Sequence, residues 1–156
     1  GPLRGGKYSL FDGGTRVPFI LSWPGTVRPR ESDALVSHVD FHASFAALTG
    51  QRLGKEEAPD SLDVLDALLG KNDTDRDELV VEGTRSKTVY RQGEWVFIPP
   101  HEGPAMNTNT NTELGNDPGP QLFDLRADPG ERRNLASARP KELRDLEALL
   151  ARIRRQ

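Results

Sequence analysis

The second half of the chain carries four short segments rich in β-branched and aromatic residues. They are Leu79–Glu82, Thr88–Arg91, Trp95–Ile98 and Gln121–Leu125. The second and third are separated only by Gln92-Gly93-Glu94, which is typical of a hairpin turn. Short strands joined in this way favour antiparallel pairing, so the pattern predicts a small four-stranded antiparallel sheet.

The end of the chain predicts a helix that packs on this sheet. Pro140 suits the first turn of a helix, because proline lacks an amide hydrogen and its φ is already helical. Apolar residues then recur on one helical face, at Leu143, Leu146, Leu150 and Ile153. Such a stripe must be covered by another element, which favours a sheet with one terminal helix on it.

The first half of the chain has shorter apolar segments with loops between them. Val17–Trp23 is a continuous apolar run closed by Pro24-Gly25, which predicts a buried strand. Two short helices and a charged linker follow, expected at Phe41–Thr49, Ser61–Gly70 and Lys71–Asp77. Asp40 is placed to cap the first helix and Gly50 to end it.

Composition excludes several classes of function. The 156 residues contain no cysteine, which excludes disulfides, thiolate metal sites and cysteine nucleophiles. The 21 basic and 24 acidic residues give a net charge of −3, so we expect no nucleic-acid partner. No apolar run approaches the roughly 20 residues of a membrane-spanning helix, so we expect no membrane partner.

Two residues are candidates for contact with a ligand. Lys7 ends Leu3-Arg4-Gly5-Gly6-Lys7, where a cation on a glycine-rich loop can bind an oxyanion such as sulfate or phosphate. A solvated loop lysine is the alternative. His101 stands near the start of the polar interval Pro99–Pro120, and loops of this length are usually functional or disordered. It can face a substrate or simply be exposed. No nucleophile–base pair or metal-ligand cluster can be assembled from this sequence.

Short motifs follow one another along the chain. The first are Gly1-Pro2-Leu3-Arg4-Gly5-Gly6-Lys7, Phe11-Asp12-Gly13-Gly14-Thr15-Arg16-Val17-Pro18, Trp23-Pro24-Gly25 and Ser37-His38-Val39-Asp40. The rest are Ser61-Leu62-Asp63, Val89-Tyr90-Arg91-Gln92-Gly93-Glu94-Trp95, Gln121-Leu122-Phe123-Asp124-Leu125, Asp128-Pro129-Gly130-Glu131 and Asn134-Leu135-Ala136. This ordered set resembles the C-terminal part of the type I, formylglycine-dependent sulfatases of the alkaline-phosphatase superfamily. Val96, where that family usually has lysine, and the lack of glycine after Asp63 are departures.

The resemblance implies an α+β, or partial α/β, organisation. Residues 1–76 would be the trailing part of an alkaline-phosphatase-like α/β catalytic domain. Residues 77–156 would be the family's C-terminal subdomain, an antiparallel sheet with a helix, and only this part would be self-sufficient. The apolar segment Val17–Trp23 would then be exposed, so the expected partners are the missing N-terminal catalytic part or a second copy of the chain.

The resemblance also implies a chemistry. In this family a formylglycine made from Cys or Ser attacks sulfur as its hydrate, while calcium held by Asp and Asn polarises the sulfate. The lysine of the L-R-G-G-K segment contacts the sulfate, and it maps to Lys7, the predicted catalytic residue. The formylglycine motif and the metal ligands are not in this sequence and are expected upstream of Gly1. We therefore expect no cofactor in this chain and no activity from it alone.

The expected parent protein hydrolyses sulfate esters. The loop from His101 to Pro120 resembles that of bacterial sulfatases acting on carbohydrates, and His101 is the predicted substrate-binding residue. Two alternatives remain open: a phosphodiesterase or phosphonate hydrolase of the same superfamily, and a non-catalytic module that binds sulfated glycans. The resemblance implies a periplasmic or secreted parent, while the residues themselves leave the location open.

Overall fold

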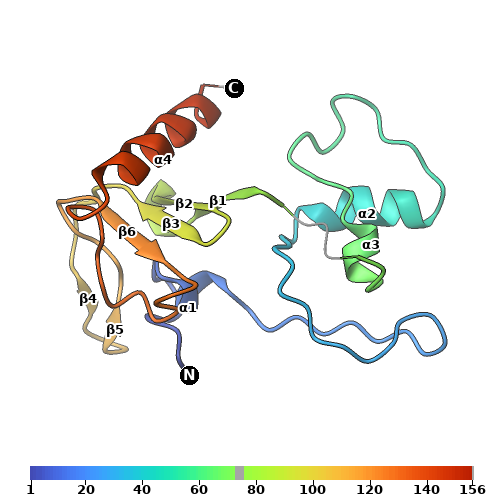
Figure 1. Ribbon diagram of the computed structural model, residues 1–156, viewed down its shortest axis with the longest axis horizontal. Coiled ribbons are helices and arrows are strands. Elements are labelled where there is room, and N and C mark those ends of the chain that lie inside the picture. Colours follow the sequence, from blue (N-terminus) through green and yellow to red (C-terminus); the bar gives the residue numbers. More distant parts are fainter. Residues whose placement is uncertain (73–75, 156) are drawn as a thin grey trace. The chain divides into compact units, whose positions relative to one another are not determined.

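A computed structural model describes residues 1–72 and 76–155, which pack as two units (Figure 1). The sheet unit comprises Gly1–Pro18 and the chain from Glu78 onward, and the helical unit comprises Phe19–Asp77. We expected a division between residues 76 and 77. The chain does pass between units next to that point, but its first 18 residues pack with the second half. The sheet unit is therefore built from two segments that are distant in sequence.

The sheet unit contains the predicted antiparallel sheet, with strand order β1-β2-β3-β6. The strands are β1 Glu78–Glu82, β2 Thr88–Gln92, β3 Trp95–Ile98 and β6 Gln121–Asp124. Tyr90 pairs with Val80 on one side and with Phe97 on the other, and Phe97 pairs with Leu122. All four predicted strands are confirmed. Their signals are local, because turn residues on either side limit the length of each strand.

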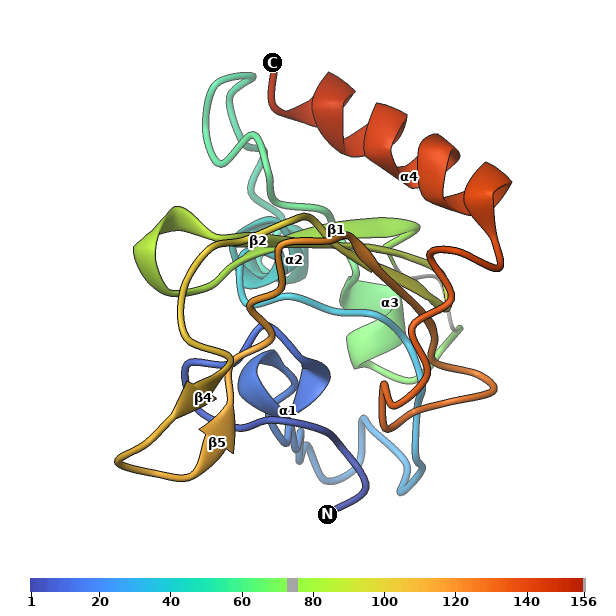
Figure 2. The same cartoon turned by 90° about the vertical axis from the view of Figure 1, so that its left-hand side faces the viewer.

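Both faces of this sheet are covered (Figure 2). Helix α4, Pro140–Ile153, confirms the predicted terminal helix and packs on one face. There Leu146 and Leu150 join Tyr90, Phe97 and Leu122. The N-terminal segment covers the other face, where Leu10 and Phe11 meet a second apolar group that includes Val89, Val96, Ile98, Phe123 and Leu125. This second cluster explains why the first 18 residues belong to the sheet unit.

The long polar interval between β3 and β6 is partly ordered as a hairpin. Its strands are β4 Met106–Asn107 and β5 Thr112–Glu113, which pair antiparallel. Two further short elements complete the sheet unit: α1, Asp12–Thr15, and a 3-10 turn, Thr84–Ser86. Figure 2 shows α1 on the side of the sheet opposite to α4. The described part of the chain contains no helix with the length and apolar character needed to cross a bilayer.

The helical unit contains α2, Asp40–Leu48, and α3, Leu65–Leu68. The first agrees with its prediction to within one residue, whereas the second is shorter than predicted. After α2 the amide of Gly50 donates to the carbonyl of Ala47, and the amide of Gln51 donates to that of Ala46. Gly50 has a φ of 69°, the left-handed conformation that this way of ending a helix requires. The predicted role of Gly50 is confirmed.

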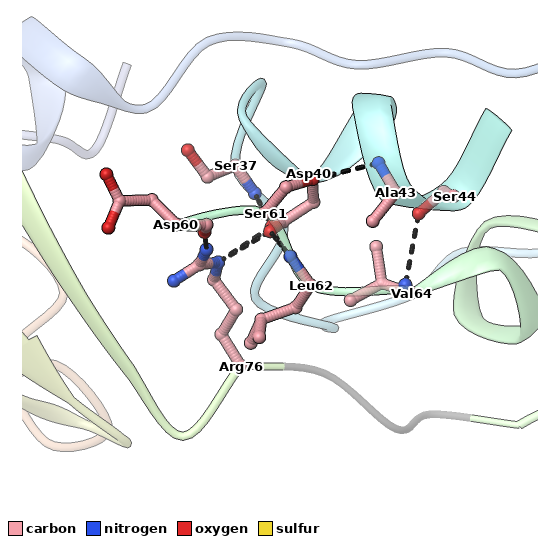
Figure 3. A network of polar contacts seen from close by, with 9 residues as sticks. All are labelled: Ser37, Asp40, Ala43, Ser44, Asp60, Ser61, Leu62, Val64 and Arg76. Atoms are coloured by element: carbon pink, nitrogen blue, oxygen red, sulfur yellow. Dashed lines mark hydrogen bonds and ion pairs between the residues drawn. The ribbon is translucent and has the colours of Figure 1, made fainter. Parts of the chain in front are cut away.

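Asp40 is not the N-cap of α2, contrary to prediction, because Val39 takes that position. Its buried carboxylate instead accepts hydrogen bonds from the amides of Ser37 and Leu62, at 2.8 and 3.0 Å, and from Nε of Arg76 (Figure 3). Burial alone would raise the pKa of Asp40, but the bonds from Arg76, Leu62 and Ser37 outweigh it and hold the pKa below its usual value. Asp40 thus joins three parts of the helical unit.

The prediction of a buried strand at Val17–Trp23 is wrong for this structure. The segment forms no strand within the described ranges, and Val17, Phe19 and Ile20 are 55%, 54% and 88% exposed. A central strand needs a neighbour for its backbone groups and cover for both faces. The described residues provide neither, so the apolar run lies on the surface.

Candidate functional site

The segment Leu3–Gly14, here called the Lys7 loop, folds back tightly on itself. The amide of Gly13 donates to the carbonyl of Arg4 at 2.9 Å. A Cβ atom on Gly13 would lie 2.4 Å from that carbonyl oxygen, and one on Gly14 would lie 2.3 Å from the carbonyl oxygen of Ser9. Any side chain at these two positions would force the backbone apart. The two glycines therefore allow the ends of the loop to meet.

Lys7 lies on the exposed part of this loop. Its Nζ atom is 5.1 Å from the centroid of the Tyr8 ring, and no carboxylate pairs with it among residues 1–72 and 76–155. Tyr8 has a φ of 78°, a conformation that is uncommon for a residue with a side chain and is often found at functional sites. The loop thus presents a cation at the surface from a defined backbone.

Arg4 attaches the Lys7 loop to two other segments. Its guanidinium donates to both carboxylate oxygens of Glu113 in β5, at 2.9 and 2.7 Å, and to the backbone carbonyl of Glu131 at 2.6 Å. It also lies 4.0 Å from the centroid of the Phe11 ring. The hydrogen bond from Arg4 holds the pKa of Glu113 below its usual value. A bidentate pair of this kind fixes orientation as well as distance.

Glu131 meets the far end of the loop. Its Oε2 atom accepts a hydrogen bond from the amide of Asp12 at 2.7 Å, and its side chain is fully buried. Burial raises the pKa of Glu131 to about 7, and burial also raises the pKa of Asp12. Within the described ranges, Oε1 of Glu131 and Oδ2 of Asp12 have no hydrogen-bond partner. Two carboxyl groups are therefore buried beside each other, with few hydrogen bonds to compensate.

His101 makes contacts within the sheet unit. Its Nε2 atom lies 3.1 Å from the carbonyl oxygen of Thr88, to which it donates, and its backbone amide donates to the carbonyl of Asp117. No hydrogen bond or ion pair joins it to Lys7 in the part of the chain that the structure describes. The two predicted site residues are thus in one unit without direct contact, and the substrate-binding role of His101 stays a prediction.

The described residues do not fit a calcium site. No group of three or more His, Cys, Asp or Glu side chains in residues 1–72 and 76–155 is arranged to hold a metal ion. Sequence reasoning missed Arg4, Glu113 and Glu131 as the residues that hold the Lys7 loop. The only available signal was that Arg4 and Glu131 lie inside the ordered motifs, which says nothing of their contacts.

Comparison with known proteins gives a consistent result. Residues 1–51 match the Sulfatase family model. An N-acetylgalactosamine-6-O-sulfatase of Bacteroides thetaiotaomicron is 44% identical over 154 residues, which is 99% of this chain and 30% of that protein. Human arylsulfatase A is 31% identical over 165 residues, covering 96% of this chain and 32% of that protein.

Solved structures agree. A Bacteroides thetaiotaomicron protein described in connection with the metabolism of multiple glycosaminoglycans has a TM-score of 0.93 at 44% identity, covering 99% of this chain and 32% of its own. A sulfatase from Pseudoalteromonas sp. has a TM-score of 0.75 at 21% identity, covering 96% and 32%, and shows the fold alone.

The chain belongs to the sulfatase family, as its ordered motifs predicted. It spans about a third of the length of the curated relatives it matches. Calcium and formylglycine are typical of this family of hydrolases.

Proposed function

We propose that this chain contributes the sulfate-contacting lysine, Lys7, to a sulfatase that hydrolyses sulfate esters of carbohydrates. The nucleophile and the metal ligands of that enzyme lie outside this sequence, and the chain alone is inactive. The observation that carries the proposal is an exposed cation on a loop held at both ends, in a chain 44% identical over almost its whole length to an N-acetylgalactosamine-6-O-sulfatase.

Lys7 acts by binding and orienting the sulfate group. Charge builds up on the sulfate oxygens and on the leaving oxygen as the ester bond breaks, and a cation fixed in advance stabilises that charge without reorganisation. The compact ammonium group suits a tetrahedral anion, because its three donors can turn toward whichever oxygens approach. Formylglycine and calcium supply the nucleophile and the Lewis acid when they are present.

A sulfated amino sugar is the proposed substrate class. Support comes from the names of the relatives, of which one is an N-acetylgalactosamine-6-O-sulfatase and one belongs to glycosaminoglycan metabolism. These names also favour a sulfate ester over a phosphodiester or phosphonate. His101 is proposed to contact the sugar, since it stands at the start of the long interval that carries β4 and β5.

The apolar surface of the helical unit supports the proposal that another polypeptide segment covers it. Phe19, Ile20 and Trp23 are exposed, and so are Phe45 and Leu48 on α2. Large apolar side chains gathered on one small unit are usually covered in the native protein. We therefore assign them to contact with the N-terminal catalytic part or, in its absence, with a second copy of this chain.

The test compares lysine variants in the parent protein that supplies the upstream residues. Lys7→Ala should lower kcat/KM for N-acetylgalactosamine 6-sulfate and for an aryl sulfate by on the order of 100-fold, the usual effect of removing one preorganised charge or donor. Lys55→Ala, at an exposed position in the helical unit, is the matched control. Wild-type turnover by Lys7→Ala would end the proposed role.

Calorimetry distinguishes the proposed role of Lys7 from the alternative of a non-catalytic module that binds sulfated glycans. If the 156-residue chain binds sulfated sugars with equal affinity in wild type and Lys7→Ala, it is a binding module with its site elsewhere. Faster hydrolysis of a phosphodiester than of any sulfate ester by the parent protein would favour the phosphodiesterase class.

A further inference from the structure

We propose that Glu131 is the positioning residue for Lys7, holding both ends of the Lys7 loop so that the ammonium group is presented at a fixed place. This inference rests on the proposed function, because it assigns a partner to the lysine named there. It concerns a residue that makes no contact with the sulfate and acts only through the loop.

Glu131 contacts the Lys7 loop on both sides of Lys7. The backbone carbonyl of Glu131 accepts a hydrogen bond from Nη1 of Arg4, three positions before Lys7. Its carboxylate accepts one from the amide of Asp12, five positions after Lys7. A loop pinned at both ends loses far fewer conformations on binding a ligand than one pinned at one end.

Glu131 is itself held in place by its own turn and by burial. It ends a turn in which its amide donates to the carbonyl of Asp128 at 3.0 Å, while the Asp128 carboxylate accepts from the amides of Arg132 and Arg133. Glu131 has a φ of 48°, a conformation that only a well-determined environment maintains. This turn follows β6, so Glu131 is part of the packed sheet unit.

Stability alone does not explain a glutamate at position 131. A fully buried carboxyl group with one oxygen lacking a hydrogen-bond partner among the described residues is unfavourable. The groups that face it are the acidic Asp12 and Asp128 and the basic Arg4. Burial beside these groups raises the pKa of Glu131 to about 7, so the group is protonated more readily than an exposed glutamate. Unfavourable buried groups of this kind cluster near functional sites.

The test is a double-mutant cycle in the parent protein, because the coupling between two residues is what a general structural role does not produce. Glu131→Met removes the side-chain acceptor at similar volume, and Glu131→Gln keeps it. Glu131→Met should lower kcat/KM at least tenfold when Lys7 is present and less than threefold in a Lys7→Ala background. Glu131→Gln should retain most of the activity. Glu94→Met, at an exposed position in the same unit, should leave kcat/KM unchanged in both the wild-type and the Lys7→Ala background.

A second measurement needs no activity. In the 156-residue chain, amide hydrogen exchange of residues 8–14 should be at least tenfold faster in Glu131→Met than in wild type or Glu94→Met. If Glu131→Met does not fold, Arg4→Met takes its place in the cycle. Glu113→Gln then shows how much of the change comes from the Arg4–Glu113 pair.

The outcomes are distinguishable. Full turnover by Lys7→Ala overturns the role of Lys7 itself. A loss in Lys7→Ala combined with an equal effect of Glu131→Met in both backgrounds overturns only the positioning by Glu131. Unchanged exchange of residues 8–14 in Glu131→Met also overturns the positioning. Strong coupling together with faster exchange supports it.

Discussion

The amide nitrogen of Asp12 lies 2.7 Å from Oε2 of Glu131, a residue 119 positions later in the chain. This bond joins the turn after β6 to a loop near the N-terminus. In the sequence, the residues of the helical unit lie between these two segments. Because both side chains are carboxylic acids in a buried place, the contact makes the stability of the sheet unit sensitive to pH.

Stability of the sheet unit should fall as the pH rises from about 4.5 to about 7. Burial raises the pKa of Glu131 from 4.5 to about 7, so in this window the folded chain holds a proton that the unfolded chain releases. The full effect is on the order of 3 kcal/mol. Asp12, whose pKa burial also raises, adds to it in the same direction.

Urea unfolding of a Trp23→Phe variant measures this, because Trp95 in β3 then reports on the sheet unit alone. Glu131→Gln should flatten the dependence of the midpoint on pH between about 4.5 and 7. An equal slope in Glu131→Gln would assign the titration to another group.

Gly13→Ala should destabilise the sheet unit by about 1 to 3 kcal/mol. Its Cβ atom would lie 2.4 Å from the carbonyl oxygen of Arg4, which is backbone and cannot move aside without opening the loop. Gly119→Ala is the control, since its Cβ atom would meet only a side-chain oxygen of Asp117 at 3.3 Å. The same Trp95 fluorescence measurement applies. Equal stability of the two variants would show that the loop tolerates expansion.

Asp40→Ala should destabilise the helical unit by roughly 3 to 5 kcal/mol. The change leaves the guanidinium of Arg76, whose side chain is 11% exposed, without its carboxylate, and leaves two amides without an acceptor. Unfolding is followed by Trp23 in a Trp95→Phe background. Asp33→Ala, at an exposed position, should stay within about 0.5 kcal/mol of wild type. A small effect at Asp40 would mean that water replaces its contacts.

A chain of residues 77–156 alone should fail to form the packed sheet unit. It lacks Leu10 and Phe11, each only 2% exposed, whose burial contributes about 3 to 6 kcal/mol together. We expect dye binding to an exposed apolar sheet face and a weak near-ultraviolet circular dichroism signal. Addition of a peptide of residues 1–18 should lower the dye binding and strengthen the near-ultraviolet signal. A fully packed 77–156 chain would instead support the self-sufficient subdomain that the sequence suggested.

The four strands of the sheet and helix α4 were predictable because their signals are local. Turn residues bound each strand, and a single apolar stripe marks the helix. Lys7 was proposed from its motif, and its contact with sulfate stays a prediction. The buried strand at Val17–Trp23 was predicted wrongly, because its apolar run is real but the described residues contain no strand to pair with it.

The partners of charged residues were beyond local reasoning. Asp40 was expected to cap α2, but its acceptor oxygens serve Leu62 and Arg76, 22 and 36 residues later. Glu131 lies in a recognisable motif, yet its contact is 119 residues earlier. Contacts at such separation depend on the tertiary fold, which no residue window contains.

The sheet unit is assembled from both ends of this sequence, and a ribosome makes the two ends at different times. Leu10 and Phe11 leave the exit tunnel before any strand that will cover them. Translation proceeds at about 5 to 20 residues per second. These side chains therefore remain without their cover for seconds, until β6 has been synthesised. During that interval they are available to a chaperone. The backbone around Lys7 cannot take its final form until the turn containing Glu131 has been synthesised.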